Sequence, residues 1–293
     1  MKPVATTTEQ GELFTVHRSM VFAIAYEVLG TRADADDVVQ ETYLRWADVD
    51  ISTVRDPRAY LATIATRTAL NTVRTVSRRR EAYPGTWLPE PLVSHHESPE
   101  QQLLMKEQLS YALSVLLQQA TPEQRAVFML HDVFGLPYPV IAKAVGKTQA
   151  AVRQIAHRAR TRLTATDHAE GTTDDSAEVL EAFLAAVVTG DLQALMNVLA
   201  PQAVLLSDGG GKVVAALRPI TGAEAVAAFL LKIARTPVPQ MRVDIDTLNG
   251  GLGVLIRTGD RLELTVAVAV NDQRKITGVY LVRNPDKLRP ARK

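Results

Sequence analysis

A proline-rich stretch, residues 83–99, separates two segments of this 293-residue chain that both have helical periodicity. Proline fixes the backbone φ angle and has no amide proton, so Pro84, Pro89 and Pro91 predict an extended segment here. The stretch includes WLPEP at residues 87–91, which is apolar where a spacer is ordinarily polar. Because prolines reduce the entropy lost on docking, we expect WLPEP to dock on another domain rather than to act as a spacer.

The residues before this stretch predict three helices. Phe14, Val21, Ile24 and Val28 lie on one helical face, and Gly30 ends that helix. The second helix begins in an acidic run, and a third is expected at about residues 57–80. The buried stripe of the second helix is predicted to be Val38, Tyr43 and Trp46, with Thr42 as the alternative to Tyr43.

The acidic start of the second helix predicts a protein interface. Its polar residues are Asp36, Asp37, Gln40 and Glu41, with Asp34 just before them. One cap satisfies the free amides of a helix start, so three aspartates are redundant as caps. A partner with a basic surface fits this face, whereas DNA would be repelled from it.

The third helix carries a cationic stripe. Its residues Arg67, Asn71, Arg74 and Arg78 are spaced so that they share one face, while Leu61, Ala65, Thr68, Thr72 and Val76 form the packing face. Arg79 and Arg80 extend the cationic run, and residues 67–80 contain no acidic side chain. Most charge runs are solvated helix faces, but those usually mix both signs. We therefore expect this stripe to bind phosphates.

Residues 101–163 are again predicted to be helical, and their order of helix and turn signals matches a helix-turn-helix motif. Thr121 followed by Pro122 predicts a helix start, and Gly146-Lys147 predicts the turn. In the last helix, base contacts are predicted for Gln149, Arg153 and Gln154, and phosphate contacts for Lys147, Thr148, Arg158 and Arg160. His157 lies on the same face, and solvent exposure without any role explains it equally well.

The last third of the chain predicts an α+β fold. A small, acidic stretch at residues 167–176 is expected to be a loop, and one or two helices are expected over residues 179–199. Five β-rich runs separated by Gly, Asn and Asp turns follow. DGGGK at residues 208–212 is expected to be a hairpin turn between AVLLS and VVAAL, since the spacing of a P-loop is missing.

Composition narrows the function further. The chain has no cysteine, which excludes disulfides and thiolate metal sites, and its formal net charge is only +1. We find no apolar run long enough to span a membrane and no secretory signal, so we expect a cytoplasmic protein without metal or cofactor.

The first two segments resemble a known family. Residues 30–48 and the basic stretch after them are similar to region 2 of bacterial extracytoplasmic-function (ECF) sigma factors of the sigma-70 family, and residues 121–163 are similar to region 4. The resemblance implies that Asp36, Asp37, Gln40 and Glu41 dock on the β′ clamp helices of core RNA polymerase, which also contacts sigma through its β subunit. It implies that the helix-turn-helix reads the minus-thirty-five element. Contacts to the minus-ten element are implied for Arg55, Arg58, Tyr60, Arg67, Asn71, Arg74 and Arg78, with Tyr60 as a stacking platform, although a core tyrosine is commoner.

The C-terminal part resembles the SnoaL-like (NTF2-like) fold. Relatives of that fold include enzymes that use a buried acid or histidine, which leaves Asp208, Asp244, Asp246 and Glu263 as conceivable bases. In the predicted strand at residues 242–247, Asp244 and Asp246 lie two residues apart and therefore share one face. That face most simply points to solvent. We expect no catalysis, while the pocket of this fold could still take an unknown small ligand.

Three short motifs place the chain in a subgroup of the family. WLPEP, DGGGK and NPDKL together resemble ECF sigma factors with a fused SnoaL-like extension that regulates the sigma unit in cis. Their residues are Trp87, Leu88, Pro89, Glu90, Pro91, Asp208, Gly209, Gly210, Gly211, Lys212, Asn284, Pro285, Asp286, Lys287 and Leu288. The expected domains are region 2 at 1–82, a linker at 83–100, region 4 at 101–166, a second linker at 167–175 and the regulatory domain at 176–293.

The sequence therefore predicts two all-α domains and one α+β domain, in a promoter-specificity subunit whose partners are core RNA polymerase and promoter DNA. Two alternatives remain at this stage. One is an ordinary helix-turn-helix regulator with a ligand-binding domain, and the other is a SnoaL-type enzyme tethered to a DNA-binding module.

Overall fold

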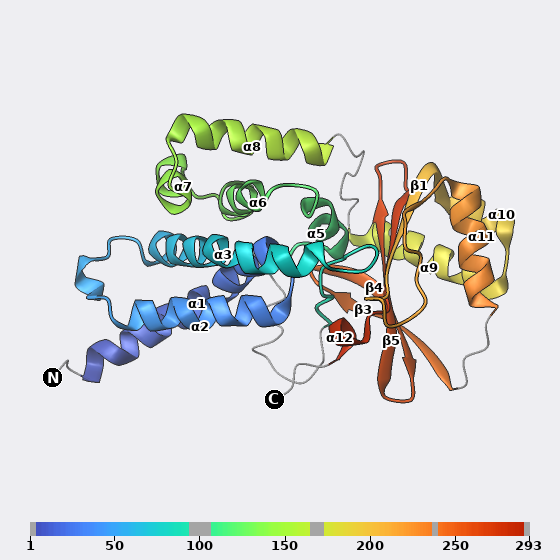
Figure 1. The fold of residues 1–293 in the computed structure, drawn as a ribbon, viewed down its shortest axis with the longest axis horizontal. Helices are drawn as coiled ribbons and strands as arrows, with labels where there is room; N and C mark the ends of the chain where they lie inside the picture. The colour runs from blue at the N-terminus through green and yellow to red at the C-terminus, as the bar shows by residue number, and fades with distance from the viewer. Residues whose placement is uncertain (1–3, 94–106, 165–172, 236–239, 290–293) are drawn as a thin grey trace. The chain divides into compact units, whose positions relative to one another are not determined.

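A computed structural model describes residues 4–93, 107–164, 173–235 and 240–289 (Figure 1). The chain divides into two compact units. Unit 1 consists of Met1–Glu81, His95–Gln108 and Leu116–Leu163, and unit 2 consists of Ala82–Ser94, Leu109–Val115 and Thr164–Lys293. The segment after the region 2 helices therefore belongs to the same unit as the C-terminal third of the chain. In the described ranges, no helix is both long and apolar enough to cross a membrane.

The first part of unit 1 contains the predicted helices. They are α1 (Val4–Leu29), α2 (Arg32–Ala47), the short 3-10 helix η1 (Ile51–Thr53) and α3 (Pro57–Glu81). Gly30 has a φ of 77°, which allows it to end α1 as expected. The stripe of α2 uses Thr42, which is buried, whereas Tyr43 is 43% exposed. The N-cap of α2 is Thr31, whose hydroxyl oxygen accepts a hydrogen bond from the backbone amide of Asp34. The aspartates are therefore not needed as caps.

The second part of unit 1 contains α5 (Tyr111–Leu117, which begins in unit 2), α6 (Pro122–Phe128), the π-helical turn η2 (Met129–Val133), α7 (Tyr138–Val145) and α8 (Gln149–Thr164). Thr121 and Gln124 form a reciprocal capping box at the start of α6. The turn between α7 and α8 uses Gly146 at φ 67°. Within unit 1, α6 and α7 lie between α8 and α3 (Figure 1).

Unit 2 is built on a six-stranded sheet. Its helices are α9 (Thr173–Thr189), α10 (Leu192–Val198), α11 (Ala223–Ala234) and α12 (Pro285–Leu288). Its strands are β1 (Leu199–Asp208), β2 (Ile220–Thr221), β3 (Met241–Leu248), β4 (Gly251–Thr258), β5 (Arg261–Val270) and β6 (Ile276–Val282), in the order β2-β1-β6-β5-β4-β3. β1 and β6 are parallel, and the other pairs are antiparallel. The predicted α+β class is confirmed. Of the loop expected at 167–176, residues 173–176 are helical, because α9 already begins at Thr173, and residues 167–172 lie outside the described residues.

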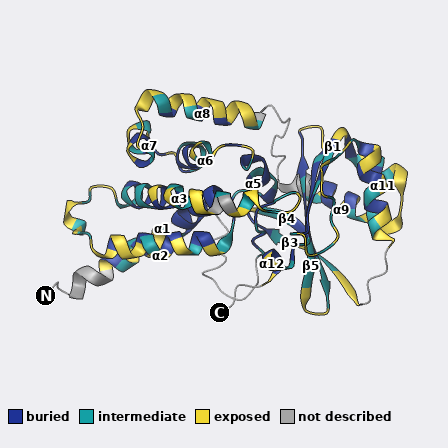
Figure 2. Cartoon of the chain, in the orientation of Figure 1, coloured by how far each residue is buried: buried dark blue, intermediate teal, exposed yellow. Residues whose placement is uncertain are grey.

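Apolar side chains cover both faces of this sheet. On one face, α9, α10 and α11 pack around residues such as Phe183, Leu195 and Leu230. On the other face, Leu88 of the linker and Tyr111 at the start of α5 pack against the sheet. Figure 2 colours much of the sheet and parts of these helices as buried. The proline-rich linker is therefore one of the layers of unit 2.

The expectation that DGGGK is a β-hairpin turn is wrong. The residues after it, 213–217, do not form a strand, and β1 pairs instead with β2 and β6. Gly210 and Gly211 have φ values of 61° and 68°, so the turn does need glycine. A Cβ at Gly210 would lie 2.5 Å from the amide carbon of Asn284, and a Cβ at Gly211 would lie 2.5 Å from Pro84. The glycines allow the close approach of two other segments.

Candidate functional site

The acidic face of α2 is accessible to a partner. Asp37 and Gln40 are exposed, while Asp36 and Glu41 are partly buried and lie 3.6 Å from Arg32 and 2.8 Å from Arg45. Desolvation raises the pKa of Asp36, and nearby arginines oppose this shift. Leu44, one turn after Gln40, is 54% exposed. A single exposed leucine is ordinary on a protein surface, so Leu44 only adds apolar area beside these carboxylates, and the sequence pattern did not single it out.

Asp34 and the last arginines of α3 have a structural role instead. The Asp34 carboxylate is buried and lies 2.6 Å from the Arg79 guanidinium, and it accepts the Thr31 hydroxyl. Arg80 donates to the carbonyl of Leu29 at the end of α1. The expectation that Arg79 and Arg80 extend the phosphate-binding stripe is therefore not supported by their contacts inside unit 1.

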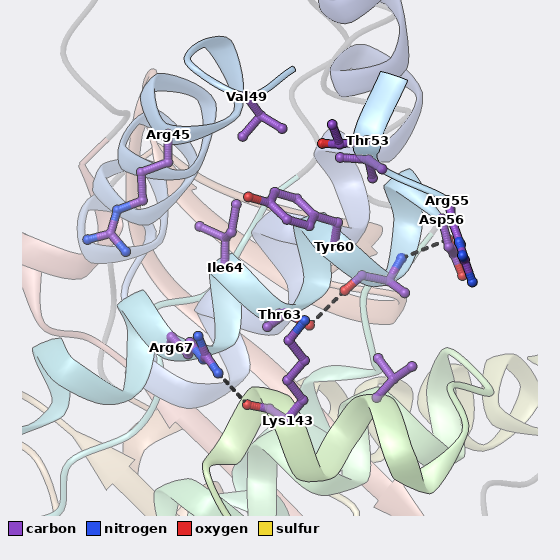
Figure 3. Close-up of a pocket in the computed structure, with 13 residues that line it drawn as sticks. Arg45, Val49, Thr53, Arg55, Asp56, Tyr60, Thr63, Ile64, Arg67 and Lys143 are labelled. Atoms are coloured by element: carbon purple, nitrogen blue, oxygen red, sulfur yellow. Dashed lines mark hydrogen bonds between the residues drawn. The ribbon is translucent and has the colours of Figure 1, made fainter. Parts of the chain in front are cut away.

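A pocket of about 560 Å³ opens within unit 1 between the end of α2, the loop after it, α3 and α7 (Figure 3). Tyr60 lies in its centre, and the Tyr60 ring is 5.9 Å from the ring of buried Trp46. The cationic residues of its wall are Arg45, Arg55, Arg67 and Lys143, and Asp56 is its acidic residue. An aromatic floor inside a cationic rim suits an unpaired base with its phosphate.

Two of the predicted minus-ten residues bind region 4 inside unit 1. Arg58 donates to the Phe134 carbonyl at 2.7 Å, and Arg67 donates to the Lys143 carbonyl at 2.7 Å. Asn71 and Arg74 are exposed on the same helix, whereas the side chain of Arg78 lies outside the described residues. Region 4 thus occupies the donors of two side chains that the sequence predicts to contact the minus-ten element.

A buried arginine cluster joins the two regions behind this pocket. Arg125 of α6 is 3% exposed and donates to the Val28 carbonyl at 2.8 Å. Gln118 accepts from Arg125 at 2.9 Å and from Arg80 at 3.0 Å. Burial lowers the pKa of Arg80 to about 9 and that of Arg125 to about 10, so both stay charged at neutral pH. Region 4 therefore helps to satisfy the free carbonyls that end α1.

The helix α8 presents the predicted residues to solvent. Gln149, Arg153, Gln154, His157 and Arg158 are all exposed, as are Lys147 and Thr148 just before the helix, although Lys147 lies 3.3 Å from the Glu123 carboxylate. Figure 2 colours much of α8 as exposed. The opposite face packs through Val152, Ala156 and Ala159, as predicted. Arg160 is also exposed, but its guanidinium lies 2.6 Å from the Asp132 carboxylate. That ion pair favours a structural role for Arg160 over phosphate binding.

The three short motifs meet at Asp208 in unit 2. This carboxylate is fully buried and accepts four donors: the Tyr83 hydroxyl at 2.5 Å, the Leu88 amide at 3.0 Å, the Gly210 amide at 3.0 Å and the Lys287 ammonium at 2.7 Å. A carboxylate bound in this way is an anchor, and none of its contacts leaves it open to a substrate. We call this group the Asp208 clamp.

Lys287 completes the clamp. It is 8% exposed, donates to the Leu88 carbonyl, and lies 4.3 Å from the centre of the Trp87 ring. Asn284 caps α12 and donates to the Tyr83 hydroxyl at 2.7 Å, while Asp286 lies 2.5 Å from Lys212. NPDKL is therefore a capped helical turn rather than a plain polar turn.

Within WLPEP, Leu88 is deeply buried, as are Pro89 and Pro91, whereas Trp87 is not. Leu88 is 1% exposed, whereas Trp87 is only half-buried and covers Lys287. Tyr83 and Tyr111 were not predicted: Tyr111 is buried and donates its hydroxyl to the Pro89 carbonyl at 2.8 Å. Burial and the nearby Asp208 raise the pKa of Tyr83, which keeps it a donor. A tyrosine on each side of the linker was the available signal.

The other candidate acids of the C-terminal third do not gather at one site. Asp244 lies 2.8 Å from Arg242 on the edge strand β3, and Glu263 lies 3.1 Å from Arg261 on β5. Asp246 is partly buried and accepts the Thr247 amide. In the described ranges, no group of three or more His, Asp or Glu side chains could hold a metal ion.

Comparisons with known proteins agree with these features. Sigma-70 region 2 matches residues 13–79, and Sigma-70 region 4 matches residues 110–163. The ECF RNA polymerase sigma factor SigJ of Mycobacterium tuberculosis is 34% identical over 94% of this chain and 91% of its own length. The probable ECF sigma factor SigI of the same species is 27% identical over 94% and 93%.

A solved structure is also similar over nearly the whole chain. The crystal structure of M. tuberculosis SigJ has a TM-score of 0.76 and 31% identity, and it covers 94% of this chain and 97% of its own. An ordinary helix-turn-helix regulator would not need the region 2 match or this full-length similarity. The chain therefore belongs to the extracytoplasmic-function sigma factors of the sigma-70 family.

Proposed function

We propose that this sigma factor carries core RNA polymerase to promoters through three surfaces and that its C-terminal unit regulates it in cis. The observation that carries the proposal is the cationic pocket around Tyr60, where Arg67 donates to a carbonyl of region 4, as Arg58 does elsewhere on α3. The form described here is one in which regions 2 and 4 must separate before both can bind DNA.

The polymerase contact is assigned to α2. Asp36, Asp37, Gln40 and Glu41 form an accessible acidic face, and Leu44 adds apolar area beside it. Such a face fits a basic partner surface with an apolar centre, as the β′ clamp helices and the neighbouring β subunit would provide. This partner also implies that the protein acts in the cytoplasm.

The DNA contacts divide between α3 and α8. Arg55, Tyr60, Asn71 and Arg74, with Arg58 and Arg67 after their release, would take the minus-ten element. The exposed face of α8 would read the minus-thirty-five element, with Gln149, Arg153 and Gln154 toward base edges.

Regulation in cis is assigned to the Asp208 clamp. Through Leu88 and Trp87 it attaches the linker between regions 2 and 4 to the C-terminal unit. No catalytic role is proposed for that unit, since Asp208 is committed to its four donors. A small ligand would act by loosening the clamp. Apolar side chains of α9, α10 and α11 pack on the sheet face that these helices cover.

In vitro transcription tests the proposal. Purified bacterial core polymerase and a pool of random promoter sequences should yield transcripts that share a pair of upstream elements only when the chain is added. Reversing two charges, Asp36→Lys with Glu41→Lys, should abolish both core binding and these transcripts. A matched reversal of two exposed acids in unit 2, Glu181→Lys with Asp260→Lys, should leave both intact. Unchanged core binding in the α2 variant would remove the assignment of that face.

A further inference from the structure

The turn between β3 and β4 holds one end of the inter-region linker. Asn249 is fully buried in this two-residue turn and has a left-handed φ of 55°. Its side-chain Oδ1 accepts the Leu92 amide at 2.9 Å, and its own amide donates to the Leu92 carbonyl at 2.7 Å. Val93 pairs with Leu248 in an isolated antiparallel bridge. Leu92, one residue past WLPEP, is therefore fixed to the turn by two reciprocal hydrogen bonds.

The same turn holds the other end of the linker. The Gly250 amide donates to the Leu109 carbonyl at 2.9 Å, and Ser110 pairs with Asn249 in a second bridge. A Cβ at Gly251 would come within 3.3 Å of the Ser110 Cβ, so glycine there permits the close approach. Two backbone segments far from the turn in sequence thus converge on adjacent residues, 249 and 250.

This convergence shortens the reach of the linker. Fully extended, residues 82–110 could span ~95 Å at ~3.3 Å per residue. With Leu92 and Leu109 fixed to one turn, residues 93–108 close a loop, which removes ~50 Å of that length. The two promoter elements, named for positions about 25 base pairs apart, lie ~85 Å apart along a duplex at ~3.4 Å per pair. While both ends are held, the remaining linker can span only about half of the separation between the two promoter elements.

We propose that Asn249 is a positioning residue that clips both ends of the inter-region linker and so keeps regions 2 and 4 too close to occupy both promoter elements. The proposal rests on the proposed function as a sigma factor. The clip is distinct from the Asp208 clamp, which holds only the segment before Leu92. Release of either end of the clip restores the length needed to span a promoter.

Asparagine is suited to this position by its chemistry. A left-handed residue other than glycine is most often asparagine, and only a side chain with an oxygen acceptor can satisfy the Leu92 amide. Asn249→Gly keeps the backbone conformation and removes that acceptor. Asn249→Asp keeps an oxygen acceptor and the tolerance of left-handed φ, and serves as the conservative variant.

Distances between spin labels test the clip in the full chain. The sequence has no cysteine, so Thr75→Cys on α3 and Ala150→Cys on α8, both exposed, give a clean label pair. The parent should show one short distance, and Asn249→Gly should raise the population of longer distances about tenfold, because a buried amide is left unpaired. Asn249→Asp should resemble the parent. Asp260→Gly, in the neighbouring β4–β5 turn, should have no effect.

Gly251→Val provides a second test at the opposite end, since its side chain would press on Ser110. It should lengthen the distances as Asn249→Gly does, while circular dichroism shows the sheet intact. Identical distance distributions in the parent and in both clip variants would overturn the proposal, as would lengthening only in variants that lose the sheet. The distance measurement needs no polymerase, so the two proposals can fail separately. If the clip variants show no lengthening while the parent directs transcription, only the clip proposal is overturned. If the distances lengthen but the parent directs no transcription, only the proposed function is overturned.

Discussion

At the scale of single residues, the buried pair of Asp208 and Lys287 joins three segments of unit 2. The two charges are 2.7 Å apart, and each makes further hydrogen bonds to the linker at Leu88. Removing one partner of a buried pair leaves the other charge uncompensated, which typically costs ~3–5 kcal/mol. Removing both charges together costs less, because neither is then stranded.

A double-mutant cycle should reveal this coupling. We expect Lys287→Met to lower the free energy of unfolding of unit 2 by ~3–5 kcal/mol, and the Asp208→Asn, Lys287→Met double variant to recover part of the loss. Urea unfolding of the full chain with Trp46→Phe in every variant, so that tryptophan fluorescence comes from Trp87 alone, measures both. Transcription by the single variant should differ from that of the parent if the clamp regulates in cis. Additive losses would show that the two charges do not act as a pair.

At the scale of elements, α8 carries residues predicted to contact DNA and residues that make contacts within unit 1. Arg158 is exposed on the predicted DNA face, whereas Arg160, two residues later, is paired with Asp132. Each phosphate contact contributes ~0.9 to the log–log slope of affinity against salt. Neighbouring arginines on the same helix are therefore expected to differ in their contribution to that slope.

We expect Arg158→Ala to reduce the salt slope of promoter binding by the holoenzyme by ~0.9, and Arg160→Ala to leave it unchanged. Gln154→Ala should instead relax the preference at one base pair by ~1–3 kcal/mol. Binding titrations at several salt concentrations, on matched and single-substituted promoters, measure both quantities. Equal slope changes for the two arginine variants would contradict the division.

At the scale of the whole molecule, regions 2 and 4 belong to one compact unit that shares buried polar groups. Arg125 from α6 satisfies the Val28 carbonyl of α1, and Gln118 bridges Arg125 and Arg80. Both regions should therefore respond when this cluster is broken, although they lie far apart in sequence.

Arg125→Met should lower the protection of amides in both α1 and α6 against hydrogen exchange by about thirtyfold, which corresponds to ~2 kcal/mol for buried carbonyls left unpaired. Hydrogen exchange of the full chain, read by mass spectrometry, reports on the two helices separately. The matched control is Arg160→Ala, which should leave α1 unchanged. Loss of protection confined to α6 would show that the regions open independently.

Local interactions made much of this architecture predictable from the sequence. The ends of α1 and α3, the cap at Thr121 and the turn at Gly146 follow from residue periodicity, capping and glycine conformation, which act over a few residues. The acidic face of α2 and the exposed face of α8 follow from helical spacing alone. The motif resemblance also marked the three segments that the structure brings together at Asp208.

The sequence by itself therefore determined the helices, the faces they present and the family to which the chain belongs. Tertiary structure alone decided that Leu88 is buried more deeply than Trp87, that region 4 holds Arg58 and Arg67, and that Asn249 joins both ends of the linker. These contacts join residues 76 to 157 positions apart. Periodicity cannot predict them, because their partners are chosen by the packing of separate elements and not by neighbours along the chain.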